Sequence, residues 1–139
     1  MSEKIDNLRI LIVHNTYQQG GGEDVVFENE SNLLRSKNIQ VDTLLFDNKV
    51  IEGGFSRLKA GLGTLYNFHS ARIIQKKIEE FKPDIIHVHN FFPLVSPAIF
   101  YVARRNKIPI ISSLHNFRLL CPSTYLLHDG KIYERSIKS

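Results

Sequence analysis

Four short apolar runs recur along the chain and are rich in residues that favour β-strands. The first run is apolar at almost every position, which is typical of a strand buried on both faces of a sheet. The second alternates loosely between apolar and polar residues and is also typical of a strand. We therefore predict strands at residues 8–14, 39–46, 84–89 and 110–115.

Between these runs the apolar residues recur at helical spacing. The first helix follows three glycines and runs to Lys37, with a polar middle at 28–32. Its predicted buried side consists of Val26, Phe27, Leu33 and Leu34. Glycines interrupt the next helical region, 55–82, so we expect a short helix and then a longer one from Asn67. Ser96-Pro97 supplies an N-cap and a first-turn proline for a last helix to Asn106.

The order of these elements is strand, helix, strand, helix, strand, helix, strand, which predicts a parallel sheet with helices on both faces. Residues 125–133 predict an additional hairpin, because Asp129-Gly130 suits a two-residue turn. The expected fold is α/β, a single Rossmann-like domain over 1–139 with about four parallel strands. In such sheets ligands bind beyond the carboxyl ends of the strands.

The composition is that of a water-soluble globular domain. The hydrophobic content of 42% and charged content of 23% are ordinary, and the longest apolar runs fall well short of the roughly twenty residues that span a bilayer. We expect the polar N-terminus not to be a signal peptide. A single cysteine, Cys121, excludes an internal disulfide and lies in no zinc or redox motif. We expect a cytoplasmic protein.

Basic residues outnumber acidic ones, giving a net charge of +4 and an isoelectric point near 9.3. The chain holds no recognisable nucleic-acid module and no run of like charge, so no nucleic-acid partner is expected. Two local basic groups either form solvated helix faces or rest against anionic lipid head groups, as a peripheral membrane contact. These groups are Arg72, Lys76, Lys77 and Lys82, and Arg104, Arg105 and Lys107.

Three consecutive glycines, Gly20, Gly21 and Gly22, separate the first strand from the first helix. Strand, glycine-rich turn and helix can bring backbone amides up to an anion, and glycines let a ligand approach the backbone. The spacing is not the dinucleotide fingerprint, so a plain tight turn is an equally good interpretation. Glu23 follows either as an acidic group for a hydroxyl or, like Asp24, as a group that stabilises the helix N-terminus.

A histidine followed by an asparagine stands at the end of three of the predicted strands. Imidazole and carboxamide are neutral donors and acceptors at pH 7 and suit sugar hydroxyls and phosphate oxygens. The carboxyl ends of parallel strands share one edge, so we expect these pairs to contribute to one site, with His115 the residue we favour; capping of the following loops is the alternative. The pairs are His14-Asn15, His89-Asn90 and His115-Asn116.

His87 and His89 lie two residues apart and therefore on the same strand face. A His-x-His pair can bind a metal, but no third ligand such as a nearby aspartate or cysteine is evident, so no metal site is expected. We expect His87 instead to be a buried histidine that is bonded to the backbone. His69 and His128 are expected at the surface.

Three blocks of the sequence, 14–26, 83–97 and 109–122, carry a combined signature. Together they resemble the family-four group of retaining glycosyltransferases with the GT-B fold, over nearly the whole chain. The resemblance implies an N-terminal, acceptor-binding domain that faces a donor-binding domain across a cleft. Its partners would be a sugar acceptor, such as a polysaccharide or glycolipid precursor, and a nucleotide-sugar.

The same resemblance implies roles for individual residues. The glycine loop would face the donor phosphates or the acceptor, and His115 would lie beside the transferred sugar as the catalytic residue. No bound metal or cofactor is implied, because basic side chains and a helix N-terminus stabilise the departing diphosphate. The predicted substrate-binding residues are Gly20, Gly21, Gly22, Glu23, His89, Asn90 and Asn116.

The chain departs from the family pattern in its extent. The donor-binding domain has no counterpart here, and further strands would be expected after the fourth. We therefore expect no sugar transfer by this chain alone, and an open sheet edge that permits self-association. The alternative is a stand-alone α/β binding or regulatory domain without catalysis. A phospho-receiver domain would want acidic residues in place of His14-Asn15, and a hydrolase would want a Gly-x-Ser-x-Gly elbow.

Overall fold

The computed structural model describes residues 7–16, 21–47, 66–92, 94–117, 119, 127–128 and 131–132. A four-stranded parallel sheet with the strand order β2-β1-β3-β4 forms its centre. The strands are β1 (Arg9–Thr16), β2 (Gln40–Asp47), β3 (Ile85–Val88) and β4 (Ile110–Ser112). All four predicted strands are confirmed, although β4 ends at Ser112 rather than at residue 115.

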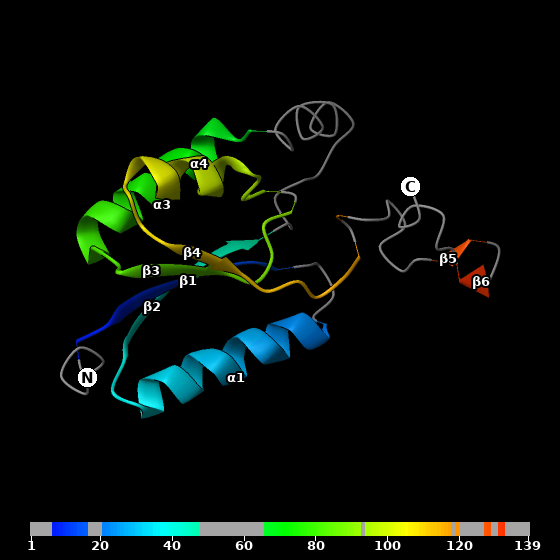
Figure 1. Cartoon of the computed structure of the whole chain (residues 1–139), viewed down its shortest axis with the longest axis horizontal. Coiled ribbons are helices and arrows are strands. Elements are labelled where there is room, and N and C mark those ends of the chain that lie inside the picture. The colour runs from blue at the N-terminus through cyan, green and yellow to red at the C-terminus, as the bar shows by residue number, and fades with distance from the viewer. Residues whose placement is uncertain are drawn as a thin grey trace.

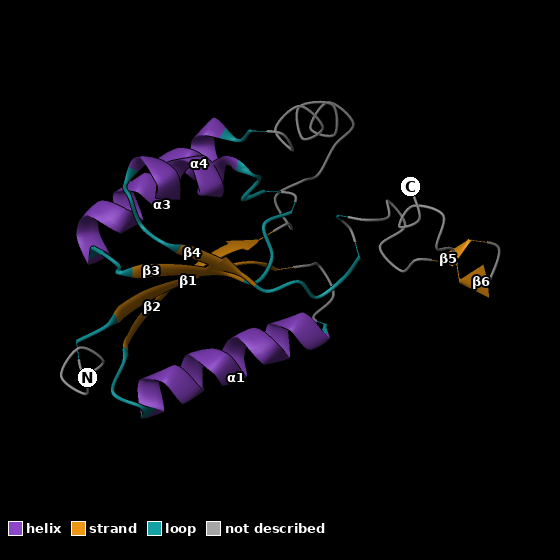
Figure 2. Ribbon diagram, in the orientation of Figure 1, coloured by secondary structure: helices purple, strands orange, loops and turns teal. Residues whose placement is uncertain are grey.

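Helices cover both faces of this sheet (Figures 1 and 2). α1 (Gly22–Ser36) lies on one face, whereas α3 (Phe68–Phe81) and α4 (Ala98–Arg105) lie together on the other. The predicted α/β, Rossmann-like architecture is thus confirmed. The short helix expected before Asn67 falls on residues outside the described part of the chain. Among the described helices, none is long and apolar enough to cross a bilayer.

Side chains fix the starts of α3 and α4. The Asn67 side-chain oxygen accepts the backbone N–H groups of His69 and Ser70 at 3.0 and 3.1 Å, which satisfies two donors of the first turn of α3. Ser96 Oγ accepts the N–H of Ala98 at 3.3 Å and that of Asn67 at 2.9 Å. α4 begins at Ala98 with Pro97 as its N-cap, one residue later than predicted, and Ser96 Oγ joins the starts of both helices at one point beside the sheet.

The sheet separates two hydrophobic clusters. The larger lies under α3 and α4 and includes the fully buried Leu11, Val13, Ile74, Ile86 and Ile99. The smaller lies under α1 and contains Ile10, Ile12 and Phe27. Because side chains alternate along a strand, His14 follows Ile10 and Ile12 onto the α1 face. Polar residues therefore replace the apolar core toward the carboxyl end of this face.

The side of α1 that faces the sheet differs from the predicted one. Phe27 is buried and Leu34 packs beside it, but Val26 and Leu33 are 44% and 58% exposed. Residues three or four positions away from Phe27 lie on the same side of the helix as Phe27. Glu30 is three residues after Phe27 and therefore also faces the sheet. The polar middle of the helix therefore contributes a carboxylate, from Glu30, to the space between α1 and the sheet.

Two further predictions concern the open edge of the sheet and the hairpin at residues 125–133. In the described sheet β2 and β4 are the outer strands, and Ile111 of β4 is 53% exposed. Self-association through this edge stays a prediction. β5 (Leu127–His128) pairs antiparallel with β6 (Lys131–Ile132), which confirms the hairpin, while the turn residues Asp129-Gly130 lie outside the described residues.

Candidate functional site

Polar side chains gather at the carboxyl edge of the sheet. The backbone N–H of His89 donates to Val13 O and that of Asn15 to Asn90 O, both at 3.0 Å. These bonds extend the pairing of β1 with β3 past the end of β3. Ser113 continues β4 in the same way, with its N–H donating to Val88 O at 2.9 Å. Three of the strand ends that carry the predicted residues are therefore held side by side.

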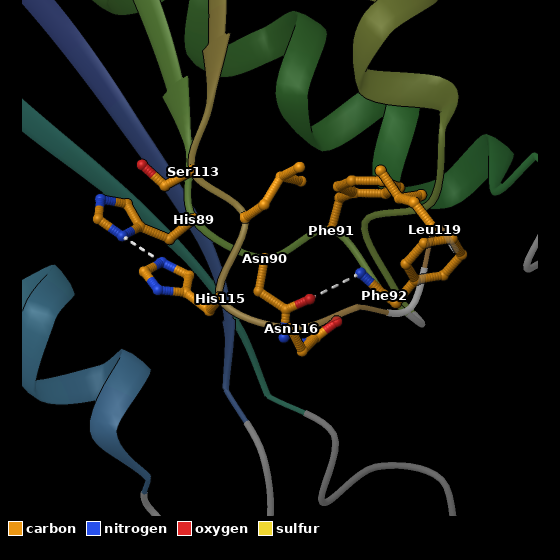
Figure 3. A pocket seen from close by; sticks show the side chains of 9 residues that line it. His89, Asn90, Phe91, Phe92, Ser113, His115, Asn116 and Leu119 are labelled. Carbon is orange, nitrogen blue, oxygen red and sulfur yellow. Dashed lines mark hydrogen bonds between the residues drawn. The ribbon is translucent and has the colours of Figure 1, made fainter. Parts of the chain in front are cut away.

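His89 and His115 are stacked at the centre of this edge (Figure 3). Their ring centroids lie 5.3 Å apart with an angle of 13° between the planes, and His89 Nδ1 lies 3.1 Å from His115 Nε2. His89 is buried, with 3% of its surface exposed, whereas His115 is exposed. A buried imidazole thus supports and orients an exposed one.

His89 is a neutral side chain at physiological pH. Its burial lowers its pKa to about 4, and the neighbouring imidazoles of His87, His115 and His14 act in the same direction. A neutral imidazole can donate a hydrogen bond from one nitrogen and accept one at the other. The pair can therefore offer hydrogen bonds to a hydroxyl without placing a buried charge beside it.

A small cavity opens beside the stacked pair (Figure 3). It has a volume of about 20 Å³, which is room for a single water molecule. The segments that follow β3 and β4 line it, including His89, Asn90, Phe92, Ser113, His115, Asn116 and Leu119. Four of the predicted site residues, His89, Asn90, His115 and Asn116, are therefore brought to one cavity.

Asn90 is held by internal hydrogen bonds. Its Nδ2 donates to Asn15 O at 3.1 Å, and its Oδ1 accepts the N–H of Phe92 at 3.1 Å. Asn15 Oδ1 accepts the N–H of Leu94 at 3.2 Å, while Asn15 Nδ2 is buried and has no hydrogen-bond partner in the part of the chain that the structure describes. Asn90 therefore positions the loop that forms one wall of the cavity, and its contact with a substrate stays a prediction.

His14 joins the end of β1 to the start of α1. His14 Nε2 lies 2.7 Å from Asp24 Oδ1, and Asp24 Oδ2 accepts the N–H of Gly21 at 2.7 Å. Burial acts to raise the pKa of Asp24, but the hydrogen bonds from Gly21 and His14, together with the attraction of His14, hold that pKa below its usual 3.8. Asp24 is thus an ionised cap, which confirms that it stabilises the helix N-terminus.

Gly21 and Gly22 begin α1, while Gly20 lies outside the described residues. Gly21 has an extended backbone, with φ −126°, and a Cβ at Gly21 or Gly22 would meet no atom within 4 Å. A tight turn therefore does not explain the glycine at either position. The amide of Gly21 is already bonded to Asp24. Glu23 is half-buried in the first turn, and the part of these residues in substrate binding stays a prediction.

Glu30 reaches both histidines of the His-x-His pair. Its Oε1 lies 2.8 Å from His87 Nδ1, and its Oε2 lies 3.3 Å from His89 Nε2. His87 Nε2 lies 2.8 Å from Ser113 Oγ. The expectation that His87 bonds to the backbone is therefore wrong, because its partners are side chains. A third potential ligand, the Glu30 carboxylate, also lies beside the two histidines, so the expectation that no third ligand is nearby is wrong.

The fold and its polar carboxyl edge define a Rossmann-like domain of the kind that forms half of a GT-B protein. The sequence model of Glycosyltransferase Family 4 matches residues 20–138, and the chain belongs to this family. The chain is 33% identical over 75 residues to an uncharacterised 42.6 kDa protein in the cps region of Klebsiella pneumoniae. That match covers 54% of this chain and 19% of the relative, so the matched segment spans about a fifth of the relative's length.

A solved structure supports the fold. The UDP-GlcNAc 2-epimerase of Neisseria meningitidis, solved with bound UDP-GlcNAc, superimposes on the chain with a TM-score of 0.54 at 15% identity. The superposition covers 84% of this chain and 36% of the epimerase chain. The family and the fold inferred from the three sequence blocks are both confirmed.

Proposed function

We propose that the chain forms one side of a site at which a sugar passes from a nucleotide-sugar to an acceptor. The observation that carries this proposal is the stacked pair of His89 and His115 at the carboxyl edge of the sheet. Parallel α/β sheets bind their ligands at this edge, and the chain belongs to a glycosyltransferase family. A polysaccharide or glycolipid precursor is the proposed acceptor, in keeping with the relative in a cps region.

In this proposal His115 lies beside the transferred sugar. Its ring is exposed and is oriented from below by the buried, neutral His89. A preorganised hydrogen-bonding group stabilises charge that develops during transfer without having to reorganise in the reaction. The residues proposed to bind substrates around it are Gly20, Gly21, Gly22, Glu23, His89, Asn90 and Asn116.

The second side of the site is proposed to come from outside these 139 residues. A cavity of about 20 Å³ cannot enclose a sugar, and the match to the relative covers only 19% of that protein's length. Groups that stabilise the departing diphosphate would then lie on the facing domain. We expect the 139 residues to bind ligand without turning it over. Release of nucleotide diphosphate by the purified chain would contradict this expectation.

The binding step can be tested with UDP-GlcNAc, chosen as the probe because the epimerase is solved with it. We expect His115→Ala to weaken binding of the probe at least about tenfold, the loss of one good polar contact. The stability cost should be about 1 to 3 kcal/mol, because Nδ1 of the buried His89 loses its partner. His69→Ala, at an exposed position of α3, is the matched control.

A stand-alone α/β binding or regulatory domain without catalysis is the second candidate. The two proposals differ in whether a donor-binding domain, joined to this chain, completes a catalytic site. Joining this chain to a donor-binding domain should produce turnover in the first case. If the joined protein turns over the nucleotide-sugar at the same rate with His115→Ala, this chain takes no part in the catalysis. That result would favour the second candidate.

We also propose a cytoplasmic location with a peripheral contact to the inner membrane face through α3 and α4. Phe68 and Tyr101 are 74% and 61% exposed and line a hollow of about 460 Å³ together with Arg72 and Arg105. Exposed aromatic and basic side chains together favour anionic lipid surfaces. Lys77 is not available for this contact, because its Nζ pairs with Asp42 at 2.6 Å.

A further inference from the structure

We propose that Glu30, His87 and His89 form a binding site for a divalent transition-metal ion of the Zn²⁺ type. One ligand atom from each of these residues lies within 4.8 Å of the other two, and Glu30 contacts His87 Nδ1 and His89 Nε2. Ligand atoms about 2.0–2.2 Å from a tetrahedral zinc lie roughly 3.3–3.5 Å apart. The observed contacts of 2.8 and 3.3 Å to Glu30 fit this arrangement after small side-chain shifts.

The first argument for an ion is an orphaned buried nitrogen. The His89 side chain is 0% exposed, and within the described part of the chain its Nε2 makes no hydrogen bond, although Glu30 Oε2 lies 3.3 Å away. Buried polar atoms without a partner are rare, and each needs an explanation. An ion between Glu30 and the two imidazoles would give this nitrogen a partner.

The second argument is that both histidines are oriented from behind. The other ring nitrogen of His87 lies 2.8 Å from Ser113 Oγ, and that of His89 lies 3.1 Å from His115 Nε2. With the ring protons on these two nitrogens, both remaining lone pairs face the Glu30 carboxylate. Metal-binding histidines have such outer partners as a rule. A cation between the two nitrogen lone pairs and the negative carboxylate would replace their mutual repulsion with attraction.

The ligand set selects the class of ion. Two imidazoles and one carboxylate suit zinc and its neighbours, whereas Mg²⁺ and Ca²⁺ prefer sites made of oxygen atoms. Three protein ligands leave one tetrahedral position for water or another oxygen ligand. The ion would link α1 to the end of β3, directly behind the His89–His115 pair. This site is independent of whether the carboxyl edge transfers sugar.

The test is a calorimetric titration of Zn²⁺ into the untagged, EDTA-treated 139-residue chain at pH 7.5. We expect one ion per chain and a rise in Tm on the order of 10 °C when zinc exceeds its Kd about a hundredfold. Glu30→Gln and His87→Ala should each weaken binding more than about 100-fold, since outer-partner changes alone cost about 10- to 100-fold. Ser113→Ala should fall within that smaller range.

Two variants serve as controls and keep the proposal open to contradiction. Glu28→Gln, exposed on the same helix, and His69→Ala, exposed on α3, should bind zinc as the wild type does. If the wild type does not bind zinc, the proposed metal site is wrong. The contact between Glu30 and His87 is then an ordinary hydrogen bond that shares one proton. Zinc binding that Glu30→Gln retains, or that His69→Ala loses, would overturn it as well.

A measurement on the wild-type chain covers the case in which a ligand variant does not fold. X-ray absorption of the zinc-loaded protein should show two imidazole nitrogens at about 2.0 Å and at least one oxygen in the first shell. A first shell without imidazole would place the ion elsewhere and contradict the assignment.

Discussion

Replacing Asp24 by alanine should destabilise the protein through the buried ring of His14. His14 is 0% exposed, and Asp24 Oδ1 is the partner of its Nε2 at 2.7 Å. Within the described residues the other ring nitrogen, Nδ1, has no hydrogen-bond partner. Asp24 therefore provides the described polar contact of a fully buried imidazole, and it also accepts the N–H of Gly21 at the start of α1.

The expected cost is about 2 to 4 kcal/mol. Loss of the cap on Gly21 contributes about 1 kcal/mol, and leaving a buried ring nitrogen unpaired contributes about 1 to 3 kcal/mol. The Asp24 side chain is 23% exposed, so water can reach part of the gap and the lower half of this range is favoured. Asp24→Asn keeps an oxygen acceptor and should cost only about 1 kcal/mol.

The pKa of Asp24 sets the pH dependence of this contribution. The pKa in the folded protein lies below the usual 3.8, so the ionised carboxylate stabilises the fold fully above pH 3.8. The contribution is lost as the pH falls through the folded pKa, because the folded state then takes up the proton. The difference in stability between the wild type and Asp24→Asn should therefore shrink below pH 3.8.

Urea unfolding followed by circular dichroism at pH 7 measures the cost, and repetition at pH 3 measures the acid effect. Glu28→Ala, at an exposed position of the same helix, is the control and should change stability by less than about 0.5 kcal/mol. An Asp24→Ala protein as stable as the Glu28→Ala protein would refute the reasoning about the buried ring.

Three further predictions concern the proposed surfaces. Gly21→Ala should change the free energy of unfolding by less than about 0.5 kcal/mol, because the added Cβ meets no atom within 4 Å. Weaker binding of the nucleotide-sugar probe by this variant would therefore indicate that the ligand contacts the start of α1. Arg104→Glu and Arg105→Glu should each lower affinity for phosphatidylserine vesicles at least about fivefold in cosedimentation, whereas Lys37→Glu should not. If the β4 edge mediates self-association, Ile111→Lys should turn concentration-dependent oligomers into monomers in light scattering.

The sheet could be predicted from sequence because its signal is local. The middle of β1, residues 10–13, is a continuous apolar run, and such a run is stable only when both faces are covered. The orientation of α1 could not be predicted in the same way, because its apolar residues are spread around the helix. Val26 and Leu33 are as apolar as Phe27 and Leu34, and only packing against the sheet separates them.

In the candidate site, too, one contact could be predicted from the sequence and another could not. His89 and His115 could be expected to meet, since both follow parallel strands whose carboxyl ends share an edge. The contact between Glu30 and His87 joins a helix to a strand that is distant in the sequence, and no periodicity links them. Whether Glu30 faces the sheet depends on the rotation of α1, which Phe27 fixes through tertiary packing.

The most direct test of the sugar-transfer proposal is an NMR titration of the ¹⁵N-labelled 139-residue chain with the nucleotide-sugar probe. Perturbed amides should cluster at residues 89–90 and 115–116 along the carboxyl edge, and the perturbations should disappear in the His115→Ala protein. Perturbations that instead cluster in the α3–α4 hollow around Tyr101, or that persist unchanged in His115→Ala, would contradict the account.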